Sequence, residues 1–228
     1  MKKQTCSFEN DYFGDYYVPY SDFTNKAFRR NLNWFKGIFL AINRFTDVQE
    51  GKGKTAIEFG CAHGAASRVL YDLGYKIIAT DISNYAISRA EKLSPQIPFL
   101  RHDIQKPLPS QAGKHNLVIC LDVIEHLENP AKAIKNMYEL IKPNGLVICS
   151  TPNDYPETRK VFTHINVKKP QQWQRLFHKA GFKNVVIRQM TFLPFLYRIH
   201  WRRLNFALHY GINIPFVCSP VFIFARKN

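Results

Sequence analysis

The chain of 228 residues contains no long hydrophobic run. A helix that crosses a membrane needs about 18 or more consecutive apolar residues, and no such stretch occurs. The first residues, Met1-Lys2-Lys3-Gln4, lead into polar and acidic positions and not into the apolar core of a secretion signal. We therefore expect a cytoplasmic protein, and the length suits one sizeable α/β core with short appendages.

Cysteine is scarce, and its spacing does not suggest a metal site. The five cysteines are Cys6, Cys61, Cys120, Cys149 and Cys218, and they contain no Cys-x-x-Cys pair. Three of them fall in predicted buried strands or in a glycine turn. This placement favours reduced thiols over disulfides.

Acidic residues are absent from the last third of the chain. Glu157 is the last one, and residues 158–228 contain 13 Lys and Arg, whereas residues 1–157 contain 19 basic and 17 acidic side chains. Most of the net charge of +15 therefore belongs to the C-terminal part. Such one-sided charge attracts anionic partners, and it is also compatible with a basic surface that only aids solubility.

The sequence also lacks the Gly-x-Gly-x-x-Gly pattern of dinucleotide sites. In its place, Ala56-Ile57-Glu58-Phe59 leads into Gly60-Cys61-Ala62-His63-Gly64, and a second apolar run ends at Asp81. This order is typical of a buried strand, a tight glycine turn, a helix and a second strand with a carboxylate at its tip, as in nucleoside sites. Glu58 would repel a pyrophosphate but favours a cationic amino-acid tail, which S-adenosylmethionine (SAM) has.

Hydrophobic periodicity predicts alternating strands and helices after a helical N-terminal part. An aromatic segment at 4–23 and an amphipathic helix at 26–45 precede a linker, and we interpret residues 1–50 as a cap on a core formed by 51–228. The core strands are predicted near 55–59, 76–81, 98–102, 116–121 and 145–150, and the helices near 65–73, 84–93, 130–141 and 170–180. This alternation predicts a parallel sheet with helices on both faces.

Two further strands, near 185–187 and 221–224, flank a basic and aromatic insertion at about 190–220. The insertion is too long for a hairpin turn, and long insertions in compact domains are usually functional.

Four short segments, taken together, carry a family resemblance. They are Glu58 to Gly64, Ala79 to Ser83, Arg101 to Ile104, and Leu121 to Leu127. From about residue 54 to 182, the chain resembles the class I SAM-dependent methyltransferases, in the small-molecule branch that includes the O-methyltransferases of the ubiquinone pathway. The resemblance implies a Rossmann-like α/β fold: a seven-stranded, mostly parallel sheet with helices on both faces and an antiparallel last strand. Ala62 replaces the middle glycine of the family's first turn, so we expect its φ to be negative.

The resemblance also implies which residues bind SAM. The set is Glu58, Gly60, Cys61, Gly64, Asp81, Ile82, Asp103, Ile104 and Leu121. The first turn would contact the methionine part of the cofactor, Asp81 the ribose hydroxyls, and Asp103 with the backbone of Ile104 the adenine ring. A helix cap at Asp81 and a solvated surface acid at Asp103 are the alternatives.

Candidate catalytic residues follow the fourth strand and the fifth. In the cluster Asp122-x-x-Glu125-His126, the imidazole of His126 could accept a hydroxyl proton. A similar Glu-x-x-Glu-His cluster is associated with a divalent metal in ubiquinone-pathway enzymes, but Asp122 departs from it, and we predict no metal. His164 lies in a loop that resembles the substrate-facing loop of small-molecule methyltransferases and is a second candidate base. Purely structural roles remain the alternative for both histidines.

We therefore predict a SAM-dependent methyltransferase that methylates a hydroxyl oxygen of a small-molecule, lipid or saccharide-linked acceptor. RNA methylation and noncatalytic SAM binding are the alternatives; RNA is disfavoured because no separate RNA-binding module is evident. The basic and aromatic C-terminal part favours an anionic membrane surface as a partner, at the inner face of a membrane. The sequence predicts no oligomeric state.

Overall fold

The computed structural model describes residues 25–108, 113–201, 205–214, 217 and 219–228, together with Phe8 and Tyr12. Its centre is a seven-stranded sheet in the order β3-β2-β1-β4-β5-β7-β6. The strands are β1 (Thr55–Phe59), β2 (Lys76–Asp81), β3 (Phe99–Arg101), β4 (His115–Leu121), β5 (Ile141–Thr151), β6 (Asn184–Gln189) and β7 (Val221–Arg226). All neighbours are parallel except β7, which runs antiparallel to both β5 and β6. The predicted fold class is confirmed.

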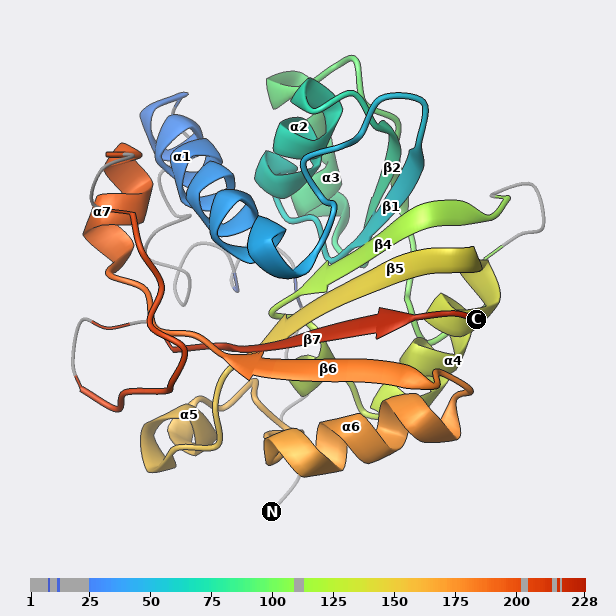
Figure 1. Cartoon of the computed structure of the whole chain (residues 1–228). Helices are drawn as coiled ribbons and strands as arrows, with labels where there is room; N and C mark the ends of the chain where they lie inside the picture. Colours follow the sequence, from blue (N-terminus) through green and yellow to red (C-terminus); the bar gives the residue numbers. More distant parts are fainter. Residues whose placement is uncertain are drawn as a thin grey trace.

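Helices cover both faces of the sheet (Figure 1). They are α1 (Asn25–Ile42), α2 (Ala65–Asp72), α3 (Asn84–Leu93), α4 (Pro130–Leu140), α5 (Pro156–Lys160), α6 (Pro170–Lys179) and α7 (Pro194–Ile199), with 3-10 helices η2 (Asn43–Phe45) and η4 (Ile124–His126). Capping side chains and first-turn prolines mark the start of several of these helices. The Ser83 hydroxyl accepts a hydrogen bond from the Ala86 amide, and the Asn129 side chain accepts one from the Lys132 amide. Prolines in the first turn start α4 and α6, where a missing N–H costs nothing.

Two apolar layers follow from the alternation of side chains along the buried strands. Ala56 of β1 packs in the layer with α1, α2 and α3, whereas Ile57 packs in the layer with α4 and α6. Residues of α1 belong to the first layer beside the sheet, among them Phe39 and Ile42. The predicted boundary between a cap and a core at residue 50 stays a prediction.

One boundary differs from the prediction. We predicted a helix near 130–141 and the next strand near 145–150, but β5 already begins at Ile141. The register between β4 and β5 shifts between His115 and Leu117, and Asn144 has φ of +60°. The residues before the predicted start of this strand therefore form an irregular first part of β5, where a bulge accommodates extra residues.

The insertion between β6 and β7 is structured. It contains α7, and an isolated antiparallel bridge joins Thr191 to Leu208. The ring of Tyr197 is fully buried and makes edge contacts with Trp34 of α1 and with Phe192, at centroid distances of 5.7 and 4.8 Å. Figure 1 shows α7 beside α1 as a consequence.

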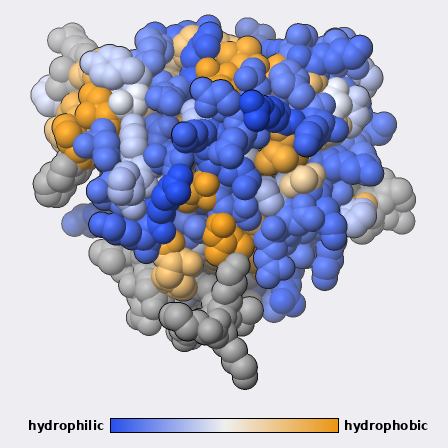
Figure 2. Space-filling view, turned by 90° about the horizontal axis from the view of Figure 1, so that it is seen from below, coloured by the Kyte–Doolittle hydropathy of each residue, from blue (hydrophilic) through white to orange (hydrophobic). Residues whose placement is uncertain are grey.

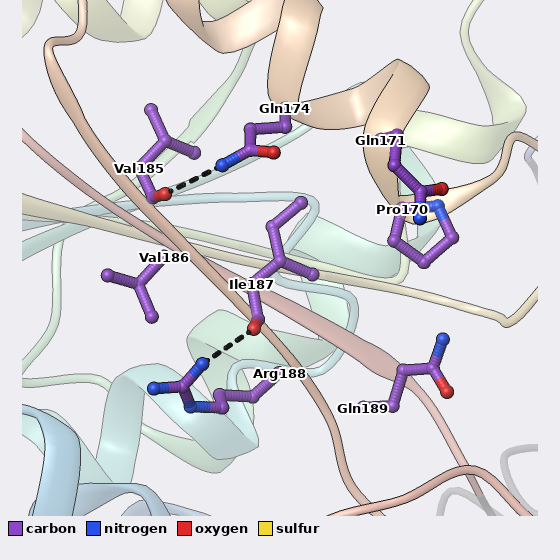
Figure 3. A pocket seen from close by; sticks show the side chains of 8 residues that line it. All are labelled: Pro170, Gln171, Gln174, Val185, Val186, Ile187, Arg188 and Gln189. Atoms are coloured by element: carbon purple, nitrogen blue, oxygen red, sulfur yellow. Dashed lines mark hydrogen bonds between the residues drawn. The ribbon is translucent and has the colours of Figure 1, made fainter.

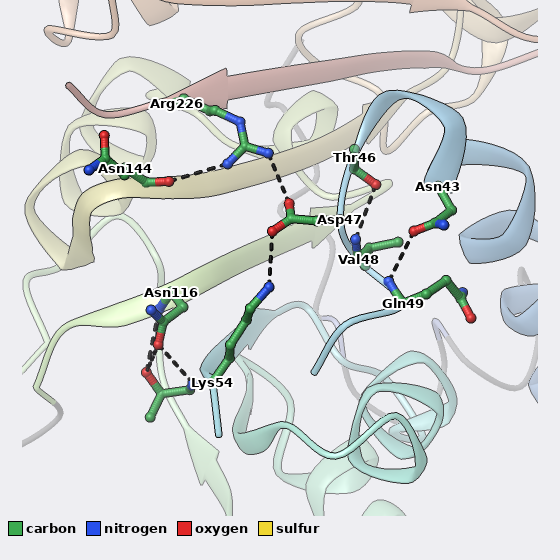
Figure 4. Close-up of polar contacts among 10 residues, drawn as sticks. Asn43, Thr46, Asp47, Val48, Gln49, Lys54, Asn116, Asn144 and Arg226 are labelled. Carbon is green, nitrogen blue, oxygen red and sulfur yellow. Dashed lines mark hydrogen bonds and ion pairs between the residues drawn. The ribbon is translucent and has the colours of Figure 1, made fainter. Parts of the chain in front are cut away.

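A polar network joins the segment that follows α1 to the C-terminal end of β7 (Figure 4). The Asp47 carboxylate accepts hydrogen bonds from Lys54 at 3.0 Å and from Arg226 of β7 at 2.9 Å. Partial burial opposes ionisation, but these two bonds hold the pKa of Asp47 down at about 2. Among the described helices, none combines the length and hydrophobicity needed to cross a bilayer.

Candidate functional site

The turn after β1 has an unusual backbone for three of its residues. Gly60, Ala62 and Gly64 all have positive φ, at +72°, +46° and +73°. The expectation of a negative φ at Ala62 is therefore wrong. A left-handed conformation costs an alanine about 1 kcal/mol, and the Ala62 amide donates a 2.9 Å hydrogen bond to Asp81 Oδ2, which holds the residue there.

Glu58 and Cys61 point inward, away from solvent. The Glu58 carboxyl is buried beneath the turn and accepts a hydrogen bond from the Ser67 hydroxyl of α2. Burial raises its pKa to about 8, and the nearby Asp81 charge adds to the effect. The Cys61 thiol packs in the apolar core, and burial raises its pKa well above the ordinary value. At Cys61 only the backbone faces the turn, so its predicted cofactor contact is restricted to main-chain atoms.

Asp81 is held between two loops at the tip of β2. Its Oδ1 accepts from the Ser83 amide and its Oδ2 from the Ala62 amide, both at 2.9 Å. Beside it, the apolar side chain of Ile82 is 43% exposed. A fixed carboxylate next to an exposed apolar side chain fits the ribose and the base of a nucleoside.

The other predicted cofactor residues lie at the same edge of the sheet. Asp103 Oδ1 accepts a hydrogen bond from the Gln105 amide at 2.9 Å. The side chain of Ile104 is buried, and its carbonyl accepts a hydrogen bond from Asn136 of α4 at 2.7 Å, which fixes the backbone after β3. Leu121 is the last residue of β4 and is buried. The structure therefore brings the predicted set together at the carboxyl ends of parallel strands.

The two candidate bases are neighbours. The rings of His126 and His164 lie 4.9 Å apart between centroids. His126 Nδ1 lies 2.9 Å from the Thr163 carbonyl, and His164 Nδ1 lies 2.8 Å from the Thr158 carbonyl. Because a carbonyl can only accept, each neutral ring carries its proton on Nδ1. Each Nε2 is therefore left with a lone pair.

Burial keeps both rings neutral. It lowers the pKa of His126 to about 4, with the backbone bond to Thr163 opposing. It also lowers the pKa of His164, while the bond to Thr158 and the Asp122 charge oppose the change. Asp122 is itself fixed, since Ser150 Oγ donates to its Oδ1 at 2.8 Å. The site thus combines neutral imidazoles with a carboxylate that favours their protonated forms.

Glu125, His126 and His164 could hold a metal ion. Each offers one ligand atom, and these atoms lie within 4.8 Å of one another. Among the described residues, neither carboxyl oxygen of Glu125 has a hydrogen-bond partner, and its Oε1 lies 3.9 Å from His126 Nε2. Burial raises the pKa of this carboxyl group well above its ordinary value. Histidines that ligate metals usually donate their other N–H to a carbonyl or carboxylate, as both rings do here. The prediction of no metal is not tested by this geometry.

Aromatic residues of the N-terminal segment border the site. Phe8 and Tyr12 contact each other edge-on and lie 5.7 and 6.3 Å from the His126 ring between centroids. They form a small apolar cluster with Ala62, Tyr85 and Ala86. We interpreted the aromatic segment at 4–23 as part of a cap on the core, without singling out Phe8. The density of aromatic residues at 4–23 was the signal that pointed there; the other residues of that segment lie outside the described ones.

A shallow groove of about 470 Å³ lies elsewhere, between α6 and the edge strand β6 (Figure 3). Gln174 donates to the Val185 carbonyl and Arg188 to the Ile187 carbonyl, both at 3.1 Å, which occupies part of the free strand edge. None of its lining residues comes from the loops after β1, β2, β3 or β4. The groove is therefore separate from the predicted cofactor site.

A glycine turn after β1, carboxyl groups on β1 and at the tip of β2, and an antiparallel β7 inserted beside β5 together define the class I SAM-dependent methyltransferases. Residues 28–187 match the family described as methyltransferase domain. This match covers most of the chain. The chain belongs to this family.

Curated relatives carry the name ubiquinone biosynthesis O-methyltransferase. The protein of Acinetobacter baylyi is 27% identical over 185 residues, which are 71% of this chain and 76% of that protein. The protein of Ruegeria pomeroyi is 29% identical over 110 residues, 46% of this chain and 44% of that protein. The match thus spans less than half the length of the Ruegeria protein. It supports the ubiquinone-pathway-like branch of the family.

Solved structures share the fold at low identity. The magnesium protoporphyrin IX methyltransferase of Synechocystis, solved with bound SAM, has a TM-score of 0.62 at 17% identity, over 95% of this chain and 94% of that chain. The N-methyltransferase NodS of Bradyrhizobium japonicum has a TM-score of 0.60 at 18% identity, over 85% of this chain and 93% of that chain. Since the second protein is named for methylation of nitrogen, the fold alone does not identify the acceptor atom.

Proposed function

We propose that the protein transfers the methyl group of SAM to a hydroxyl oxygen of a small-molecule, lipid or saccharide-linked acceptor. The observation that carries the proposal is the pair His126 and His164, whose Nε2 lone pairs lie at the edge of the sheet that holds the predicted cofactor residues. An acceptor hydroxyl needs a group that takes its proton as the new bond forms, and a neutral imidazole can do so.

In this proposal the first three loops hold the cofactor. Asp81 accepts from the ribose hydroxyls while its two backbone bonds keep the turn after β1 closed against the tip of β2. Asp103 and the backbone of Ile104 meet the adenine. When bound, SAM supplies an electrophilic methyl group on a sulfonium. The residues of the chain align the acceptor with that group and exclude water.

His164 is the better base of the two. A base works best when its pKa is near the working pH, and burial takes the pKa of His126 down to about 4. At His164, the Asp122 charge opposes the lowering and would stabilise the imidazolium. His126 then orients the hydroxyl or shares its proton, and Phe8 and Tyr12 border the acceptor.

A divalent cation at Glu125, His126 and His164 is a second candidate for the same cluster, favoured by the closeness of their three ligand atoms, which lie within 4.8 Å of one another. A cation there would bind the acceptor oxygen and lower its pKa, so that no protein base is needed. Dialysis against a chelator, followed by readdition of Mg²⁺ or Zn²⁺, separates the two roles. Turnover that survives the chelator supports the histidine base.

The proposed place of action is the cytoplasm, at the inner face of a membrane. It is supported by the acid-free stretch at 158–228 with its 13 basic residues. The alternatives are methylation of RNA and SAM binding without catalysis.

The test is incubation with SAM that carries a labelled methyl group and with separated cell fractions of lipid, polysaccharide, RNA and small metabolites. We expect label in the lipid, polysaccharide or small-metabolite fraction, in a product stable to mild base as an ether is. Label in RNA would replace the proposal by the first alternative. SAM binding in calorimetry without label in any fraction would support the second.

A further inference from the structure

Among the described residues of the insertion, six large apolar side chains are exposed to solvent. Each is between 47% and 63% exposed, and we call them the insertion surface: Phe195, Ile199, Trp201, Phe206, Tyr210 and Ile214. Single exposed apolar residues are normal on proteins, but six within twenty residues of sequence are not explained by chance placement.

The fold does not need this surface for its packing. In α7 the side chains of Leu196 and Tyr197 are buried, and the Tyr197 ring contacts Trp34 of α1. Phe195 and Ile199 are four residues apart and therefore share the opposite face of the helix. Arg198 lies next to them and is half-buried. The helix thus directs an apolar and basic face to the outside.

The neighbouring surface is basic. α1, which packs beside α7, carries Lys26, Arg29, Arg30 and Lys36, and Arg44 just beyond it contacts His209 at 2.6 Å. The sequence has no acidic residue at 25–46 or at 190–214. Exposed aromatic and aliphatic residues beside uncompensated positive charge are the combination that suits a bilayer with anionic headgroups.

We infer that the insertion surface docks onto an anionic phospholipid membrane, with Phe195, Ile199 and Trp201 inserted at the headgroup level. Basic residues of α1 and α7 then meet the lipid phosphates. Figure 2 shows a group of hydrophobic side chains at the left edge of the underside, the side on which α7 and 205–214 lie in Figure 1, and further groups at the top, in the middle and in the lower part of this view. RNA as the partner would leave the exposed aliphatic residues unexplained.

The surface continues toward the candidate site. Asn213 donates to Glu157 of α5 at 3.1 Å, and the loop after α5 exposes Val161, Phe162 and Ile165 around His164. If the protein has the proposed function, an acceptor dissolved in the membrane would reach His164 along these exposed apolar side chains without passing through water. The docking itself does not depend on methyl transfer.

The experiment is flotation of the full chain with vesicles of phosphatidylcholine alone or mixed with phosphatidylglycerol, across a salt series. We expect stronger flotation with the anionic vesicles than with phosphatidylcholine alone at low salt, and a weaker part that persists at high salt with both because apolar area is buried. Phe195→Ser/Ile199→Ser should lower the partition coefficient about tenfold or more at high salt. Arg198→Gln should lower it about fivefold, and at low salt only.

The control is Tyr71→Ser/Leu100→Ser, which removes two exposed apolar side chains, 42% and 45% exposed, from α2 and β3, away from the insertion. It should float like the wild type. Circular dichroism and SAM calorimetry on every variant separate this inference from the proposed function, since flotation can fail while SAM binding remains and the reverse. No flotation of the wild type, an equal loss in the control, or release of the wild type from vesicles by RNA would overturn the inference.

Discussion

At the scale of single residues, Asp81 has two roles that can be separated. It holds the turn after β1 through the Ala62 amide, and on our proposal it also accepts from the ribose. Asp81→Ala removes both and should weaken SAM binding by about 1–3 kcal/mol, the cost of unpaired buried groups. Isothermal calorimetry measures the change.

Asp81→Asn is the control, because the amide oxygen can still accept from one backbone N–H. We expect an intermediate affinity. An affinity for SAM that is unchanged in both variants would contradict the ribose contact.

The two histidines give a second prediction at this scale. His164→Ala should lower kcat by about 10²-fold and His126→Ala by less, with little change in SAM affinity, because His164 has the more favourable environment for a base. Because the pKa of His126 is about 4, its protonation should not limit kcat/KM above about pH 5. Stopped-time assays across pH measure both. His178→Ala, in α6 and outside the site, is the control; near-normal turnover in the double variant would leave alignment of the acceptor as the whole mechanism.

At the scale of elements, the contact between α1 and α7 requires a glycine at position 37, because the ring of Tyr197 occupies the space of a side chain there. A Cβ at Gly37 of α1 would overlap the ring of Tyr197. Gly37→Ala should therefore push α7 off α1 and lower the free energy of unfolding by about 1–3 kcal/mol, as overpacking of a core does. Urea unfolding measures the stability, and the rate of tryptic cleavage at Arg198 reports whether α7 has lost its packing.

Lys36→Ala, one position earlier on the same helix, adds no volume near Tyr197 and is the matched control. If Gly37→Ala left stability and cleavage as in the wild type, the described packing of α7 would be wrong.

At the scale of the whole molecule, buried titratable groups give the stability opposite dependences on pH. The folded chain raises the pKa of Glu58 from 4.5 to about 8, so this group contributes stability that is fully present below pH 4.5 and is lost as the pH rises through about 8. Burial lowers the pKa of His63 from 6.5 to about 3 and that of His126 to about 4. Their contribution is present above pH 6.5 and is lost as the pH falls toward those values.

Glu58→Gln should remove the loss of stability at alkaline pH. We expect the variant to gain about 4 kcal/mol relative to the wild type between about pH 5 and pH 9, since each unit by which the pKa of Glu58 is raised corresponds to about 1.4 kcal/mol, while the acid loss stays. Thermal unfolding at a series of pH values measures it. Glu50→Gln, an exposed carboxyl in the linker, is the control; a parallel decline of wild type and Glu58→Gln would mean that Glu58 is ionised in the folded protein.

The sequence by itself determined the elements and the edge of the sheet at which the chemistry lies. Apolar runs, helical spacing and turn residues are local signals, and they predicted the seven strands and the helices α1, α2, α3, α4 and α6. Asp81 and Asp103 were identifiable because acidic residues at the ends of parallel strands meet at one edge. The uneven charge was equally readable, since it needs no structure at all.

Only the tertiary structure decided how distant residues meet. His126 and His164 come from different loops, and their 4.9 Å separation and the tautomer of each ring depend on carbonyls that folding places beside them. The positive φ of Ala62 depends on Asp81, 19 residues away, and the position of α7 depends on the gap at Gly37. Such features follow from packing between segments far apart in the chain, and the local conformational preferences of the residues do not predict them.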